Sequence, residues 1–113
     1  MDINNVIERI ITLNHAWKIA RDDFGAKNAI TQALRLQKSS WQATLLRDFP
    51  QQAFLRRDLE NSTDEEVLFS VRLVNPATIN GVVRRDAEHL PERIAQQLFH
   101  PQELVSLLKL ESL

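Results

Sequence analysis

The sequence predicts a compact all-α domain, with a long helical hairpin followed by several short helices. Two observations lead to this prediction. The first half of the chain carries apolar residues at helical spacing over two long stretches. The 113 residues also include only two glycines, which is few for a turn-rich β-sandwich. A chain of this length fits a single domain, spanning residues 1–113.

The first predicted helix begins close to the N-terminus. Its apolar residues recur every three or four positions and therefore share one face of a helix; they are Val6, Ile10, Leu13, Trp17, Ala20 and Phe24. Gly25 follows directly, and glycine accepts the left-handed backbone conformation that commonly ends a helix. We therefore expect this helix to end near residue 24.

A second helix is predicted over residues 27–48, with Trp41 and Leu45 on its apolar face. It ends before Pro50, because the residue that precedes a proline avoids helical backbone angles. Proline is also well suited to the first position of a helix. We therefore expect Pro50 to open a short third helix that carries Phe54, Leu55 and Leu59.

Residues 62–76 decide between two fold classes. Thr63 and Glu66 match a capping box, in which the hydroxyl caps a backbone amide and the glutamate reaches back to another. This match predicts a helix over 64–74. A second helix over 76–88 would then follow it, with a proline at its first position.

The same stretch also carries a competing pattern. Apolar residues alternate at Val67, Phe69, Val71 and Leu73, which is typical of a strand. The alternative fold is therefore α+β, with a hairpin near 66–85 that pairs 66–74 with 78–85. We favour the two helices over this hairpin.

The C-terminal part of the chain predicts further short helices. Pro91 is suited to open one helix, and the His100–Pro101 pair is suited to open another. Apolar residues follow each proline at helical spacing, at Ile94, Leu98 and Phe99 and again at Leu104, Leu107 and Leu108.

Composition excludes several classes of protein. The chain has no cysteine, so it forms no disulfide and has no cysteine-based zinc site or thiol nucleophile. No apolar run approaches the roughly 20 residues of a membrane span. Asp2 stands where a secretory signal would carry a basic residue, so we expect no signal peptide and a cytoplasmic location.

Basic residues suggest one candidate site, for nucleic acid or another anion. Several of them follow one face of the second predicted helix, as phosphate contacts would require. The candidate residues are Lys27, Arg35, Lys38, Arg84 and Arg85. Against this, the net charge of the chain is −1, and a row of polar residues is also what the solvated face of an ordinary helix contains.

The sequence gives little support for catalysis or metal binding. His89 and Glu92 are spaced to share a helix face, but a metal site needs three or four ligands. No nucleophile elbow, phosphate loop or HExxH helix is present. We therefore expect neither an enzyme nor a bound cofactor or metal.

The leading functional hypothesis is a non-catalytic protein-interaction or regulatory module. It would act through a helical surface and form a homodimer, because the apolar faces of the long hairpin exceed what the short helices can cover. The candidate interface residues are Val6, Ile10, Leu13, Trp17 and Trp41. The alternative is a small DNA- or RNA-binding regulator that uses the basic residues named above.

Overall fold

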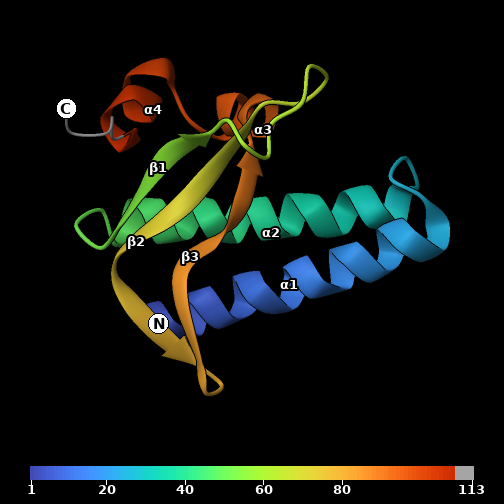
Figure 1. Ribbon diagram of the computed structural model, residues 1–113. Coiled ribbons are helices and arrows are strands. Elements are labelled where there is room, and N and C mark those ends of the chain that lie inside the picture. The colour runs from blue at the N-terminus through green and yellow to red at the C-terminus, as the bar shows by residue number, and fades with distance from the viewer. Residues whose placement is uncertain (109–113) are drawn as a thin grey trace.

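The computed structural model describes residues 1–108 and has an α+β fold, so the predicted all-α helical bundle is wrong. Two long helices come first, followed by three antiparallel strands and two short helices (Figure 1). The elements are α1 (Ile3–Phe24), α2 (Ala29–Asp48), β1 (Ala53–Asp58), β2 (Leu68–Ile79), β3 (Val82–Pro91), α3 (Glu92–Leu98) and α4 (Pro101–Leu107).

The two long helices form where the sequence predicts them. At the start of α1, the Asp2 carboxylate accepts a hydrogen bond from the Asn5 amide at 2.9 Å, and Gly25 follows the helix with a φ of 92°. The Asn28 side chain caps α2 by accepting from the Ile30 amide at 2.8 Å. Both ends of the connection therefore use residues whose chemistry suits a helix boundary.

The predicted third helix after Pro50 is instead the strand β1. Ala53 and Leu55 are buried, whereas Phe54 between them and Arg56 after them are more exposed. This alternation of burial is that of a strand with one face on the core. Two neighbouring apolar residues on a short segment do not distinguish a helix from a strand.

The predicted helix over 64–74 is also wrong, although one of the two hydrogen bonds of the predicted capping box forms. The Glu66 amide donates to the Thr63 hydroxyl at 3.1 Å, and the Thr63 amide donates to the Glu66 carbonyl. These bonds close a turn, and no helix continues from it because β2 begins at Leu68. The alternating residues Phe69, Val71 and Leu73 are the ones that enter the core.

The predicted helix over 76–88 is replaced by the end of β2, a tight turn and most of β3. Asn80 and Gly81 have φ values of 51° and 80°, which are those of the two-residue turn that fits the twist of a hairpin. The alternative hairpin of 66–74 with 78–85 is therefore right in kind, but the observed one is longer.

The sheet has the order β1-β2-β3, and the α1–α2 hairpin covers one of its faces (Figure 1). Between these two layers lies the core, to which α1, α2 and all three strands contribute. The helices α3 and α4 match the two predicted C-terminal helices, and Leu108 pairs with Leu55 along the outer edge of β1. Within residues 1–108, no helix is long and apolar enough to cross a membrane.

Candidate functional site

The face of the sheet that points away from the helical hairpin carries a polar groove of about 700 Å³. All three strands and the β1–β2 loop contribute to it. Its walls and floor are formed by Arg56, Arg57, Asp58, Leu59, Glu60, Asn61, Ser70, Arg72, Asp86 and His89.

Strand pairing explains why these residues meet. Arg56 lies opposite Ser70, and Ser70 lies opposite His89, so the three form one row across the sheet. Arg72 and Asp86 form the next row between β2 and β3. Directly opposite residues of antiparallel strands point to the same face, with their Cβ atoms about 5 Å apart.

A bulge in β3 brings Asp86 and His89 onto that face together. One residue of β2 lies between the paired positions Ser70 and Arg72, whereas two residues of β3 lie between their partners, Asp86 and His89. Glu88 takes the extra position with a φ of 69°, and its amide donates to the Asp86 carboxylate at 3.1 Å. Such bulges re-aim side chains, and they are frequent beside functional sites.

The bulge is held from the core side by Gln42 of α2. This side chain is fully buried, and its Nε2 atom donates to the carbonyl oxygens of Ala87 at 2.8 Å and His89 at 3.1 Å. Because buried carbonyls need a donor, the glutamine fixes the backbone of β3 directly behind the groove.

A hydrogen bond in the groove joins Asp58 to His89. Asp58 Oδ2 lies 2.8 Å from His89 Nε2, and the two residues come from the two outer strands. Asn61 donates to the same carboxylate from its amide at 3.2 Å and its side chain at 2.8 Å. These hydrogen bonds, first those from Asn61 and then that from His89, lower the pKa of Asp58 below its usual value.

Arg72 is the cation at the centre of the sheet. It is half-buried, and within residues 1–108 no carboxylate oxygen lies within 4.0 Å of its guanidinium. Arg57 differs, because it lies 3.4 Å from a carboxylate oxygen of Glu92. A half-buried arginine that has no acidic partner among residues 1–108 is suited to receive one from a ligand.

The predicted anion-binding residues do not form one row. Lys38 is buried, with only 2% of its surface exposed. Its Nζ atom lies 3.1 Å from the Asn14 side-chain oxygen and 4.9 Å from the centre of the Trp17 ring. Burial lowers the pKa of Lys38 to about 8, and the positive charge of Arg35 adds to this effect.

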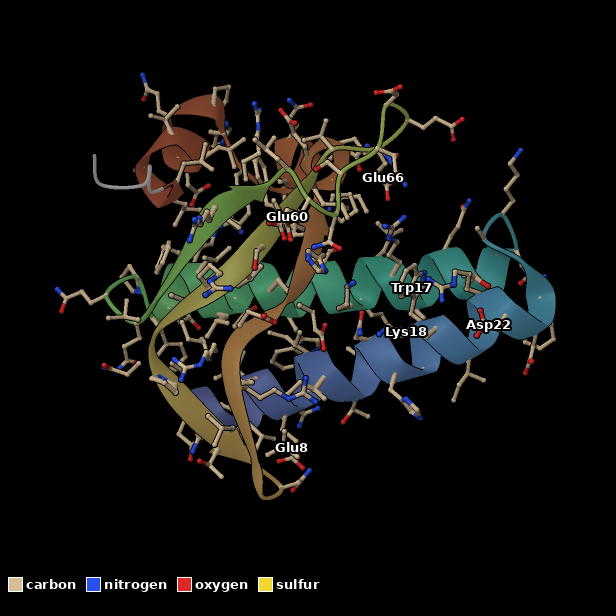
Figure 2. All side chains as sticks on the ribbon, viewed as in Figure 1. Glu8, Trp17, Lys18, Asp22, Glu60 and Glu66 are labelled. Atoms are coloured by element: carbon tan, nitrogen blue, oxygen red, sulfur yellow. The ribbon has the colours of Figure 1, made fainter. Side chains whose placement is uncertain are left out.

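Arg35 is engaged with the β1–β2 loop. Its guanidinium donates to both oxygens of the Glu66 carboxylate, at 2.6 Å and 3.3 Å, and Arg93 of α3 approaches the same carboxylate at 3.4 Å. Figure 2 labels Glu66 on this loop and Trp17 where α1 faces α2. Burial would raise the pKa of Glu66, but the hydrogen bond and charge of Arg35, helped by Arg93, lower it overall.

The other three basic candidates lie apart from these two. Arg84 of β3 is 3.5 Å from a carboxylate oxygen of Glu88, and its Nε atom is buried without a partner. Lys27 is exposed in the turn between α1 and α2, and Arg85 is exposed on β3. The five residues are thus spread over several elements, with differing degrees of burial.

The predicted interface residues also divide into two groups. Val6 and Ile10 are at most 1% exposed and belong to the core beneath the sheet. Leu13 and Trp41 are half-buried, and they line a groove of about 590 Å³ on the side of the hairpin away from the sheet. Trp17 is half-buried too, with the cationic groups of Arg21, Arg35 and Lys38 within 4.9 Å of its ring centre.

The residues considered as metal ligands have other partners. His89 is bonded to Asp58, and Glu92 faces Arg57. In the part of the chain that the structure describes, no group of three or more histidine, aspartate or glutamate side chains is arranged to hold a metal ion.

Sequence reasoning missed most of the groove. Ser70 and Arg72 alternate with the buried residues of β2, so a strand assignment would have placed both on the outer face. The bulge at Glu88 leaves no comparable signal, because glutamate is not a residue that favours positive φ. Comparison with protein-family models, curated proteins and solved structures gave no match, so function rests on the site alone.

Proposed function

We propose that this protein is a protein-interaction module whose binding surface is the polar groove on the open face of the sheet. In this account, a partner places a carboxylate against Arg72. The observation that carries the proposal is the half-buried Arg72, at the centre of the groove, without a carboxylate within 4.0 Å among residues 1–108.

The charges of the groove support a polypeptide partner over a nucleic acid. Three arginines and three acids line it together, namely Arg56, Arg57, Arg72, Asp58, Glu60 and Asp86. A phosphate backbone carries one sign of charge and would meet these acids unfavourably. A polypeptide presents both signs, and mixed charge favours selection of one partner over others.

Backbone contacts at the edges of the sheet favour binding of a partner at the face of the sheet over addition of a strand at its edge. Leu108 pairs with Leu55 on the outer side of β1. On β3, the carbonyl oxygens of Ala87 and His89 already accept hydrogen bonds from Gln42. Added strands need free backbone groups along an edge, and both edges are partly occupied.

The absence of cysteine agrees with a reducing compartment, and we propose the cytoplasm.

The test is the affinity for short labelled peptides measured by fluorescence anisotropy. An acetylated, amidated peptide of alternating glutamate and lysine should bind, and Arg72→Gln should weaken its binding at least tenfold. Arg85→Gln is the matched control, because it removes the same charge from an exposed arginine that does not line the groove. Equal binding by both variants and the wild type contradicts the proposal. Tighter binding of a mixed-sequence DNA duplex, weakening steeply with salt, would support a nucleic-acid function instead.

A second candidate function is self-association through the outer side of the helical hairpin. The specific observation is the groove of about 590 Å³ that Leu13 and Trp41 line there. Leu13→Glu should convert a dimer into a monomer of unchanged fold in analytical ultracentrifugation. A wild-type protein that sediments as a monomer at high concentration rules this candidate out.

A further inference from the structure

Arg72 and Asp86 carry opposite charges on neighbouring strands, yet they do not pair with each other. They lie directly opposite across β2 and β3, so their Cβ atoms are about 5 Å apart on one face of the sheet. Both residues are half-buried and line the polar groove. Among residues 1–108, however, neither has a group of opposite charge within 4.0 Å. The groove therefore contains an acid and a base that are both available to a ligand.

The bulge in β3 explains why this pair stays open. The Glu88 amide donates to Asp86 Oδ1 at 3.1 Å, which holds the carboxylate along its own strand instead of across the sheet toward Arg72. Glu88 keeps its position because Gln42 bonds the carbonyl oxygens on either side of it, those of Ala87 and His89. The separation of the two charges is therefore set by the backbone of β3.

Each member of the pair keeps free hydrogen-bonding capacity. In the part of the chain that the structure describes, Asp86 Oδ2 has no donor and is not enclosed by protein atoms. The Arg72 guanidinium makes no hydrogen bond there either, and it is not enclosed. A carboxylate accepts from ammonium and guanidinium groups, and a guanidinium donates to carboxylates in a paired geometry. The two side chains can therefore take one basic and one acidic group from the same ligand.

The other charged residues of the groove are less suited to this role. Asp58 already takes part in three hydrogen bonds, two from Asn61 and one with His89. Three charged residues of the walls are exposed to solvent, namely Arg56, Arg57 and Glu60. Ion pairs between exposed groups contribute little, because water and salt screen them. The half-buried pair of Arg72 and Asp86 is therefore the best-placed pair for a ligand that carries both charges.

We infer that the groove recognises an extended polypeptide segment in which an acidic and a basic residue stand two positions apart. The acid binds Arg72 and the base binds Asp86. Residues two apart in an extended chain share a side and lie roughly 6.5 Å from each other, which the long side chains involved can match. A helix is about 10 Å across with its side chains, and the groove holds only about 700 Å³. The inference rests on the proposed function, because it names the charge pattern of the partner.

The test compares two labelled peptides of identical composition with the whole protein by fluorescence anisotropy. The first contains two repeats of Glu-Ala-Lys-Ala and presents both charges on one side of an extended chain. The second contains two repeats of Glu-Lys-Ala-Ala and presents them on opposite sides. Both are acetylated and amidated, and both are too short to form a stable helix. The first peptide should bind at least fivefold more tightly than the second.

A substitution in the peptide combined with one in the protein isolates the contact to Asp86. Replacing both lysines of the first peptide by methionine should weaken its binding to the wild type about tenfold. Asp86→Asn should weaken the lysine peptide by a similar factor and leave the methionine peptide nearly unchanged, since only the lysine peptide loses an ion pair. Asparagine keeps an oxygen that accepts from the Glu88 amide, so the bulge is retained. Asp64→Asn is the matched control, because Asp64 is exposed and does not line the groove.

Two results would overturn the inference. One is equal binding of the two repeats by the wild type. The other is an effect of Asp86→Asn that is the same for the lysine and the methionine peptide. If Asp86→Asn does not fold, as judged by far-UV circular dichroism, the comparison of the two repeats on the wild type carries the test.

The same measurements separate this inference from the proposed function. If both repeats bind equally and Arg72→Gln weakens each of them, the groove binds a polypeptide and the charge pattern is wrong. If neither repeat binds, and the peptide of alternating glutamate and lysine does not bind either, both the function and the charge pattern are wrong.

Discussion

The burial of Lys38 could not be predicted from the spacing of polar residues along the sequence. It lies in a polar stripe of α2 that has the spacing of a solvated helix face. The stripe instead faces the interior, where Thr31, Lys38 and Gln42 are each at most 2% exposed. Neighbouring elements decide which side of a helix meets water, and the residues of the helix alone do not contain that information.

The burial of Lys38 has a consequence for stability. Its pKa falls from 10.5 to about 8, so the charged form is disfavoured in the folded protein. Below pH 8 the lysine is charged in both the folded and the unfolded protein. The folded protein then bears the full free-energy cost of burying that charge, at most about 3 kcal/mol. This cost decreases between pH 8 and 10.5, where only the unfolded chain still binds the proton.

Replacing Lys38 by methionine should therefore raise the free energy of unfolding at pH 7. The methionine keeps the length of the buried stem, and the lost contact to Asn14 offsets part of the gain, leaving about 1–2 kcal/mol. Urea unfolding of both proteins at pH 7 and pH 10 tests this. The gain should be smaller at pH 10, and a variant less stable than wild type at pH 7 contradicts this prediction.

Gln42, in contrast to Lys38, stabilises the folded protein. Its Nε2 atom satisfies two carbonyl oxygens of β3, and removing it leaves buried acceptors without a donor. Gln42→Ala should therefore lower the free energy of unfolding by about 2–4 kcal/mol. Gln37→Ala is the control, since Gln37 is exposed on the same helix. If both variants lose equally little stability in guanidinium unfolding, Gln42 does not hold the bulge.

At the scale of elements, the two long helices were predictable, β2 and β3 appeared only in the alternative hairpin, and β1 was not predicted. The apolar stripe that ends at Gly25 is a local signal, and α1 follows it to Phe24. The capping box at Thr63 and Glu66 is also local, yet it closes only a turn. The Glu66 carboxylate reaches Arg35 and Arg93, which are distant in sequence, and these contacts hold the loop that leads into β2.

The role of Glu66 predicts a dependence on pH. Its folded pKa is lowered by its arginine partners, so its contribution is present above the unfolded value, near 4.5, and is lost as pH falls through the folded value. Glu66→Gln should cost about 1–2 kcal/mol at pH 7. The difference from wild type should nearly vanish at pH 3. Thermal unfolding at both pH values measures this, and a cost that persists at pH 3 argues against an ionic contribution.

At the scale of the whole molecule, strand pairing builds the candidate site. Asp58, Ser70, Arg72 and His89 come from three strands, and none of them carried a recognisable motif. Even a correct strand assignment would have put Asp86 and His89 on opposite faces, because an uninterrupted strand alternates at every residue. The sequence therefore predicted the layer of helices beneath the sheet, while the open face depended on pairing and on one bulge.

The most direct test of the central claim is a chemical-shift map of the ¹⁵N-labelled protein titrated with the peptide of alternating glutamate and lysine. The amides of Arg56, Ser70, Arg72 and His89 should move together and saturate, and those of Leu13 and Trp41 should not. The same titration of Arg72→Gln should leave the spectrum unchanged. Shifts that cluster on the outer side of the helical hairpin, or that persist in Arg72→Gln, would contradict binding at the open face of the sheet.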